Sequence, residues 1–441
     1  MAEKLAVLGG PKAVQTPAGN IFDWPIVTQE AEDAALGVLR RGAMSGTDVT
    51  KKFEDEYAAW QGTKYALAFS TGTAALQGAM YGCGVRTGDE IICPSVTYWA
   101  SAMPVFSLGG TVVFAEVDPD TLCIDPKDLE RRITKRTKAI VVVHYCGYPA
   151  PMAEIMEIAN RRKIKVIEDV SHAHGGVSGG RKLGSIGHVS GMSLMSGKSL
   201  AIGEGGMLCT DDRETYEYAL SLGHYERFGA DIQTEELKQF LGLPIGGYKY
   251  RMHQCSSAVG RVQLKDYDAR NAEILKAMNY FWDLLDGAPG IRAHRPPRGS
   301  GAEMGGWYAA HGLYRAEELG GLSITRFCQA VAAEGCSTGP GCNIPLHLHP
   351  VFNTCDIYGA GKPTRIAHSR RDLRQPPGSL PVSEKIPAMT YSVPWFKFCR
   401  QNIIEEHANA FRKVAENYKL LLDSDPGNPP TLGGWHFFSH R

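Results

Sequence analysis

Short apolar runs alternate with amphipathic stretches along the first half of the chain. The apolar runs between residues 64 and 210 have the length and composition of buried strands, and the stretches between them have helical spacing. Predicted helices lie at Thr73–Gly82, Tyr98–Ser107 and Met152–Arg162. The predicted strands are Tyr65–Phe69, Glu90–Cys93, Thr111–Val117, Ala139–Tyr145, Lys165–Glu168, Met192–Ser196 and Met207–Thr210. This alternation predicts βαβ units, and therefore an α/β fold with a mostly parallel sheet covered on both faces.

The pattern changes after about residue 250. Amphipathic helices are predicted at Arg261–Leu285, Thr325–Glu334 and Asn402–Leu422. Segment 336–396 is irregular and interrupted by proline. The end of the chain from Asp423 has no periodicity, so we expect it to be poorly ordered or to dock on a partner surface.

Composition excludes several classes of protein. The chain has 441 residues with 47 Lys+Arg and 47 Asp+Glu, and this balance gives no electrostatic reason to bind nucleic acid or an anionic membrane. No apolar run is long enough for a membrane span, and no secretion signal is recognisable. The eleven cysteines include no C-x-x-C pair, which indicates a reducing, cytoplasmic environment. Glycine is abundant, with 50 residues, which predicts tight turns and close backbone approaches.

A lysine follows the sixth predicted strand, in a loop rich in serine and glycine. The run Ser196-Gly197-Lys198-Ser199 leads into Gly203-Glu204-Gly205-Gly206. Glycines let the backbone close around a ligand. A lysine whose pKa is lowered can form a Schiff base with an aldehyde. A solvated loop lysine is the simpler alternative when Lys198 is considered alone.

An acidic residue, Asp169, ends the fifth apolar run. Ligands of open α/β sheets bind at the carboxyl ends of strands, and a carboxylate there can hold a protonated pyridinium nitrogen. A helix cap or a surface acid is the alternative. His172 and His174 form an H-x-H pair, but no further ligands with metal-like spacing accompany them, so we predict no metal site.

Small and hydroxyl-bearing residues separate the first predicted strand from the next helix. In Ser70–Thr73, the helix N-terminus offers free N–H groups and a positive dipole end to a phosphate, and the threonine hydroxyls add contacts. A capped helix without a ligand is the alternative. Tyr98 follows the second strand, where an aromatic ring can stack on a planar ligand, whereas Trp99 is as readily a core residue.

Taken together and in this order, these motifs resemble the sugar-aminotransferase (DegT/StrS) family of fold-type I pyridoxal phosphate enzymes. The resemblance extends from about residue 20 to 422 and rests on Ser70–Leu76, Thr97–Ala100, Glu168–Gly175 and Ser193–Gly206. It implies a mostly parallel, seven-stranded α/β sheet flanked by helices, with a smaller α+β C-terminal domain. The expected units are a large cofactor domain over 1–270, a small domain over 271–423 and a flexible tail over 424–441.

The resemblance also implies a role for each matching residue. Lys198 is expected to form the Schiff base with pyridoxal 5′-phosphate and to shuttle the proton, and Asp169 is expected to hold the ring nitrogen. His172 matches the position near the ring hydroxyl oxygen, and Tyr98 matches the stacking position. The remaining expected cofactor-binding residues are Thr71, Gly72, Thr73 and Ser193.

One position departs from the family. An Asn-Tyr-Arg-like motif usually places an Asn on the phosphate of the neighbouring subunit's cofactor, whereas here Gly247–Met252 carries Lys249 at that point. A lysine is a good point-charge ligand for phosphate, so the role can survive; the alternative is that this corner has been rebuilt. The resemblance implies a homodimer with shared active sites.

The second half is most similar to the branch that aminates keto-inositols, where His347 and His349 become candidates for the substrate pocket. Surface histidines next to a proline turn are the alternative. The implied function moves an amino group from glutamate or glutamine to a ketone of a sugar or cyclitol, in amino-sugar, aminocyclitol or antibiotic biosynthesis. The alternative is a dehydratase or an aromatising enzyme of the amino-hydroxybenzoate-synthase type. The dehydratases replace the lysine with histidine, so Lys198 argues against them but not against the aromatising enzymes.

Overall fold

A computed structural model describes residues 4–369 and 371–435 of the chain. Within these residues, seven strands form one sheet in the order β1-β9-β8-β5-β4-β2-β3. Strand β9 runs antiparallel to its neighbours β1 and β8, and the remaining pairs are parallel. The bounds are β1 Tyr65–Phe69, β2 Glu90–Pro94, β3 Thr111–Ala115, β4 Thr137–Val143, β5 Lys165–Asp169, β8 Val189–Ser193 and β9 Gly206–Thr210. The predicted α/β class with a mostly parallel sheet is confirmed.

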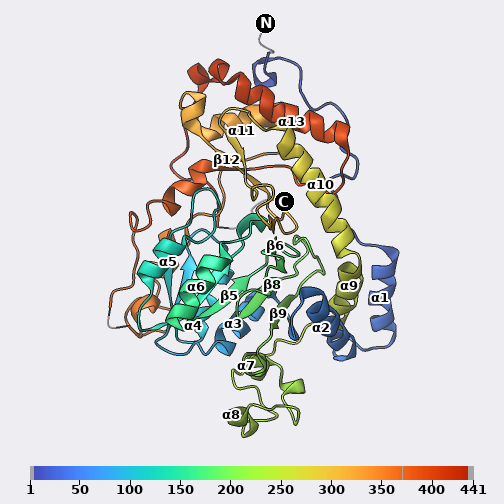
Figure 1. Cartoon of the computed structure of the whole chain (residues 1–441), viewed down its shortest axis with the longest axis vertical. Coiled ribbons are helices and arrows are strands. Elements are labelled where there is room, and N and C mark those ends of the chain that lie inside the picture. Colours follow the sequence, from blue (N-terminus) through green and yellow to red (C-terminus); the bar gives the residue numbers. More distant parts are fainter. Residues whose placement is uncertain (1–3, 370, 436–441) are drawn as a thin grey trace.

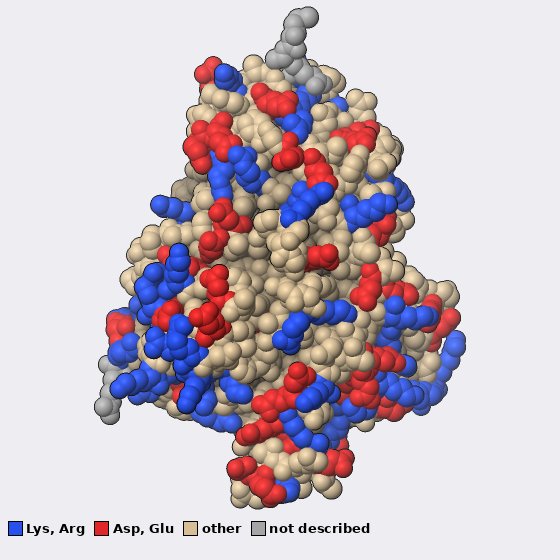
Figure 2. Space-filling model, viewed as in Figure 1, with Lys and Arg blue, Asp and Glu red and all other residues tan. Residues whose placement is uncertain are grey.

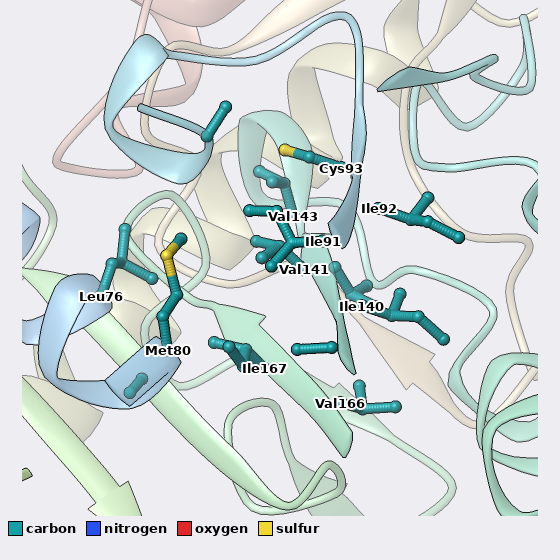
Figure 3. Close-up of a cluster of buried hydrophobic side chains, with 14 of the residues drawn as sticks. Leu76, Met80, Ile91, Ile92, Cys93, Ile140, Val141, Val143, Val166 and Ile167 are labelled. Atoms are coloured by element: carbon teal, nitrogen blue, oxygen red, sulfur yellow. The ribbon is translucent and has the colours of Figure 1, made fainter. Parts of the chain in front are cut away.

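Both faces of this sheet are buried, which explains why its strands are almost continuously apolar. Figure 3 shows side chains of β2, β4 and β5 meeting Leu76 and Met80 of α3 (Gly72–Gly82). The other helices that follow these strands are α4 (Pro104–Ser107), α5 (Pro126–Arg132), α6 (Met152–Arg162) and α7 (Arg213–Gly223). Because both faces are covered, ligands reach the sheet at the ends of its strands.

A second sheet lies at the upper end of the molecule in Figure 1. It contains the antiparallel strands β10 (Ile291–Ala293), β12 (His311–Tyr314) and β13 (Thr390–Ser392). Three helices accompany it: α10 (Tyr267–Leu284), α11 (Ile324–Ala333) and α13 (Gln401–Glu416). Their apolar side chains form a core of their own. We propose that 1–270 and 271–423 are the two domains, a division supported by these separate cores.

Two further groups of elements connect the halves. Strand β11 (Ala302–Glu303) pairs with β6 (Val177–Ser178), which also pairs with β7 (Arg181–Lys182). Helix α9 (Gln254–Lys265) continues into α10 and packs against α1 (Gln29–Arg40) and α2 (Asp48–Gln61), as Figure 1 shows. The short helices α8 (Glu235–Lys238) and α12 (Pro350–Asn353) complete the α-helices of the described residues.

The structure corrects several predicted boundaries. The predicted helix Tyr98–Ser107 is a 3-10 turn, Trp99–Ser101, followed by α4, because Pro104 cannot donate to a preceding turn. The predicted helix Arg261–Leu285 is in fact parts of two helices, α9 and α10, which meet at Asp266. The sequence does not show this break because the apolar spacing continues across it. The predicted strand Met192–Ser196 is β8, which extends from Val189 to Ser193, because its pairing with β9 ends at Ser193. The last helix ends at Glu416 and a 3-10 stretch, Tyr418–Ser424, follows it.

The part of the predicted tail that the structure describes contacts the rest of the chain. Asp425 accepts hydrogen bonds from the Ser323 backbone N–H and hydroxyl. The Gly434 N–H donates to the Cys342 carbonyl at 3.1 Å. Residues 436–441 lie outside the described residues, and the flexibility of 424–441 stays a prediction.

The surface carries acidic and basic side chains side by side, as Figure 2 shows for one face. The mixture of charges on this face agrees with the equal numbers of acidic and basic residues in the sequence. Among the described residues, no helix is long and apolar enough to cross a membrane.

Candidate active site

A cavity of about 380 Å³ lies at the carboxyl ends of the parallel strands. Its walls come from the segments that follow β1, β2, β5 and β8, which the fold brings to one edge of the sheet. The lining includes the predicted residues Thr71, Gly72, Thr73, Tyr98, Asp169, His172, Ser193 and Lys198. The residues predicted from motifs in distant segments of the sequence therefore meet in one place.

The Lys198 side chain is buried inside this cavity and is 7% exposed. Burial lowers its pKa to about 7, although the nearby Asp169 carboxylate opposes this effect. Its Nζ lies 3.8 Å from the centre of the Tyr308 ring. Trp24 donates a hydrogen bond to the Lys198 carbonyl at 3.0 Å, which fixes the backbone. Near neutral pH, a substantial fraction of this amine is therefore unprotonated and able to react.

Asp169 is held at the end of β5 and is 4% exposed. Its Oδ2 accepts a hydrogen bond from the Ser101 hydroxyl at 2.7 Å, and its Oδ1 accepts from the Ser171 N–H at 3.0 Å. The Ser101 hydroxyl also lies 3.0 Å from the Thr97 hydroxyl. The carboxylate is thus fixed in direction by residues from two strand ends.

His172 is buried and neutral. Burial lowers its pKa well below the usual range, and the Lys198 charge adds to that effect. The Cys146 N–H donates to His172 Nδ1 at 3.3 Å, so the ring proton is on Nε2. The ring centre lies 4.8 Å from that of Tyr308. His172 therefore offers the cavity a neutral hydrogen-bond donor.

The N-terminus of α3 forms one wall of the cavity. Thr71 caps the helix by accepting a hydrogen bond from the Ala74 N–H at 3.1 Å. The first N–H groups of a helix have no partner within the helix, so those of Gly72 and Thr73 can bind an anion. A Cβ at Gly72 would lie 2.6 Å from the Cα of Ser193. Glycine is required here because β8 and α3 approach so closely.

Replacing Gly72 with alanine is expected to force this helix and strand apart. We expect the free energy of unfolding to fall by about 1–3 kcal/mol, as in other overpacked sites, and ligand affinity at the helix N-terminus to fall with it. The matched control is Gly37→Ala in α1, where nothing lies within 4 Å of an added Cβ; it should be neutral or stabilising by up to ~1 kcal/mol. Denaturant titration and cofactor binding measure both effects. Wild-type values for Gly72→Ala would refute this account of the wall.

The lowered pKa of Lys198 gives a second prediction. Only a neutral amine reacts with an acylating reagent, so labelling of Lys198 in protein freed of cofactor should rise with pH and reach half its maximum near pH 7. Asp169→Asn removes a charge that raises this pKa, so the midpoint should move to lower pH. Lys397 is an internal control, because burial also lowers its pKa to about 7 and Asp23 is its nearby acid. A Lys198 midpoint near the ordinary value of ~10.4 would contradict the prediction.

Three predicted candidates lie elsewhere. Lys249 is exposed and does not line the cavity of its own chain. His347 is fully buried, where Nδ1 meets the Ser95 hydroxyl at 2.7 Å and Nε2 meets Glu384 at 3.0 Å. His349 caps α12. Neither histidine lines the cavity of its own chain, and a role for them in the substrate pocket stays a prediction. The alternative of a surface histidine does not hold for His347, which is buried.

Other residues of the cavity are not recognisable from the sequence motifs. Ser101 lies within a predicted helix, where its hydroxyl has no apparent partner, and Thr97 has no signal of its own in the sequence. Tyr308 comes from the second half of the chain, where the sequence shows only a glycine pair before two aromatic residues. Met195 and Glu204 are near the lysine in the sequence and also line the cavity.

Among the described residues, no group of three or more His, Cys, Asp or Glu side chains is arranged to hold a metal ion. Ser199 lies 3.4 Å from His174 Nδ1, and burial lowers the pKa of His174 to about 3. The groups that the cavity offers to a ligand are the Lys198 amine, the fixed Asp169 carboxylate and the N-terminus of α3.

The fold defines the class of protein as the pyridoxal-phosphate-dependent aminotransferases, because it matches their solved structures. The chain belongs to the DegT/DnrJ/EryC1/StrS aminotransferase family, whose pattern matches residues 25–395. The predicted family resemblance and the enzyme class are confirmed.

Named relatives and a solved structure agree with this family. The L-glutamine:scyllo-inosose aminotransferase of Streptomyces griseus is 30% identical over 435 residues, which cover 95% of this chain and 99% of the relative. The L-glutamine:2-deoxy-scyllo-inosose aminotransferase of Streptomyces kanamyceticus is 34% identical over 353 residues, 75% of this chain and 79% of the relative. An aminotransferase structure from Psychrobacter cryohalolentis has a TM-score of 0.75 and 26% identity, covering 90% of this chain and 99% of that chain.

Members of this family depend on pyridoxal 5′-phosphate, and the predicted cofactor is confirmed. The cavity residues fit its chemistry. The cofactor has an anionic phosphate, an aldehyde and a basic ring nitrogen, and the cavity has a helix N-terminus at Gly72, a buried amine at Lys198 and a buried carboxylate at Asp169.

Proposed function

We propose that this enzyme transfers the amino group of glutamine or glutamate to a ketone carbon of a cyclitol or sugar, in aminocyclitol or amino-sugar biosynthesis. The observation that carries the proposal is the buried Lys198 amine, with its pKa near 7, in one cavity with the fixed Asp169 carboxylate. The two Streptomyces relatives, named as glutamine:inosose aminotransferases, support the donor and the acceptor class.

In this proposal, the cofactor is held by residues at its two ends. The N–H groups of Gly72 and Thr73, with Ser193, would hold the phosphate. Asp169 would keep the ring nitrogen protonated, and the neutral His172 would donate from Nε2 to the ring oxygen. Tyr98 is half-buried in the cavity wall and would cover the ring. When bound, pyridoxal 5′-phosphate supplies an aldehyde that accepts an amino group and a ring that accepts an electron pair.

Lys198 would carry the proton between the two positions that change during amino transfer. As a neutral amine, its Nζ would take a proton from the donor's α-carbon, and as an ammonium it would deliver that proton to the carbon on the other side of the transferred nitrogen. A pKa near 7 suits both steps, because the amine can accept and release a proton at similar cost. Burial of Lys198 and Asp169 keeps bulk water from competing for this proton.

A test of the proposal follows the two half-reactions by absorbance. Glutamine, glutamate and alanine are offered as donors to the enzyme with its cofactor as the aldehyde. Scyllo-inosose and a nucleotide-linked keto sugar are then offered to the amine form. We expect glutamine or glutamate to convert the first form and the inosose to restore it. Conversion of the keto sugar alone would select the sugar over the cyclitol as acceptor. No conversion by any donor would overturn amino transfer.

We also propose that two copies of the chain form a homodimer with shared active sites. Exposed apolar side chains gather near α8, at the lower end of Figure 1: Phe240, Leu241, Leu243 and Ile245. Such a patch is typical of a contact surface. Lys249 follows it in the chain and is exposed, as a residue that reaches the partner's phosphate must be.

The dimer proposal predicts the effect of a charge in this patch. Leu243 is 75% exposed, and Leu243→Asp is expected to shift the sedimenting species from dimer to monomer mass. The control is Leu420→Asp, which charges a leucine that is 46% exposed in another part of the chain, and it should stay dimeric. A wild-type protein that sediments as a monomer, or a Leu243→Asp variant that stays dimeric, would refute this surface.

A further inference from the structure

The face of the Tyr308 ring meets the Lys198 amine. Nζ lies 3.8 Å from the ring centre, and the Tyr308 side chain is 4% exposed while it lines the cavity. Lys198 comes from the loop after β8, whereas Tyr308 lies between β11 and β12. The second half of the chain therefore supplies a wall for an amine carried by the first half.

The backbone around Tyr308 adopts unfavourable conformations to place this ring. Trp307 has φ +54° and Ala309 has φ +52°, although neither is glycine. A residue with a side chain pays a conformational cost in this region, and such strain is concentrated at functional sites. The backbone at Gly305 also lies so close to Ala173 that only glycine fits, because a Cβ at Gly305 would lie 2.2 Å from the Ala173 carbonyl oxygen.

Hydrogen bonds hold this strained segment against the rest of the site. The Gly305 N–H donates to the Gly147 carbonyl at 3.0 Å, and the Gly306 N–H donates to Asn271 Oδ1 at 3.1 Å. His311 Nδ1 lies 2.6 Å from the Ala309 carbonyl oxygen. The position of Tyr308 is thus fixed from three directions.

Several groups facing Lys198 change the balance between its amine and its ammonium. The Asp169 carboxylate and the Cys146 thiol raise its pKa, and burial lowers it. The Lys198 charge in turn lowers the pKa of His172 and of His174, which keeps these two rings neutral. The face of an aromatic ring attracts a cation, so Tyr308 acts in the same direction as Asp169.

We propose that Tyr308 is a positioning residue for Lys198, whose ring face holds the Nζ ammonium in place while the lysine carries the transferred proton. This role rests on the proposed function, in which Lys198 is a free amine for part of each turnover. The ring face carries the effect. Phenylalanine should therefore replace tyrosine with little loss, and an aliphatic side chain such as leucine should not.

The experiment compares Tyr308→Phe and Tyr308→Leu in the full chain. In protein freed of cofactor, the pH midpoint for acylation of Lys198 should move down by roughly one unit in Tyr308→Leu and stay near the wild-type value in Tyr308→Phe. The midpoint for Lys397, which lies over Trp395, should stay in place in both. In the loaded enzyme, kcat should fall about tenfold for Leu and less than about threefold for Phe. Tyr308→Met replaces Tyr308→Leu if the latter does not fold.

Two results would overturn the proposal. One is an unchanged Lys198 midpoint in the aliphatic variant, which would leave Tyr308 a purely structural role. The other is equal damage in Phe and Leu, which would assign the effect to the hydroxyl. Acylation of Lys198 does not depend on amino transfer, so its pH midpoint tests the contact between Tyr308 and Lys198 even if the proposed function is wrong.

Discussion

Replacing Lys198 with alanine is expected to lower kcat for amino transfer by at least about 10³-fold. The variant loses the group that moves the proton, and general acid–base catalysis contributes on the order of 10² to 10⁴ in rate. It also loses the amine that binds the cofactor covalently. Lys198→Arg should be equally inactive, because arginine keeps the charge and cannot release its proton at neutral pH.

Borohydride reduction measures the covalent part of this prediction. In the wild-type enzyme, peptide mass spectrometry should find the cofactor mass on the peptide that contains Lys198. It should not find it on Lys397, an equally buried lysine whose amine donates to the Trp395 carbonyl at 2.8 Å. Lys198→Ala should lose the labelled peptide. A Lys198→Ala enzyme that turns over at a rate near wild type would refute the assignment.

Asp169→Asn is expected to lower kcat by on the order of 10²-fold. Asparagine can still accept from the Ser171 N–H at its Oδ1, and its amide N–H can donate to the Ser101 hydroxyl oxygen in place of the bond that the carboxylate accepts. The variant therefore removes the negative charge with little change of shape. Without that charge, the ring nitrogen is less readily protonated and accepts the electron pair less well. Stopped-flow measurement of the glutamine half-reaction isolates this step.

Ser101→Ala is a milder variant for comparison with Asp169→Asn. It removes one hydrogen bond to Asp169 and keeps the charge, so its loss should be about tenfold or less. If Asp169→Asn were no slower than Ser101→Ala, the charge of Asp169 would not be the important feature.

The sequence was sufficient to place the residues that end or follow a strand. Apolar runs mark the strands, and parallel strands end at the same edge, so Asp169 at the end of β5, Tyr98 after β2 and Lys198 after β8 come to lie close together. Their meeting in one cavity follows from topology. Gly72 was also predictable, although the reason for glycine there, contact with Ser193, required the structure.

Residues supplied by the second half of the chain were not predictable in the same way. Tyr308 reaches Lys198 through a strained turn, and no periodic pattern encodes such a turn. The partners of His347 are also invisible in the sequence. A histidine beside a proline in an irregular segment resembles a ligand, whereas here its two nitrogens join Ser95 to Glu384. Local spacing does not reveal such long-range partners.

Transfer of a labelled nitrogen is the most direct test of the central claim. The wild-type enzyme is incubated with glutamine that carries heavy nitrogen at its amino group and with scyllo-inosose, and the products are examined by mass spectrometry. Amino transfer predicts a cyclitol product that has gained one amine and carries the heavy nitrogen. A cyclitol product that has lost water or become aromatic without gaining nitrogen would contradict it.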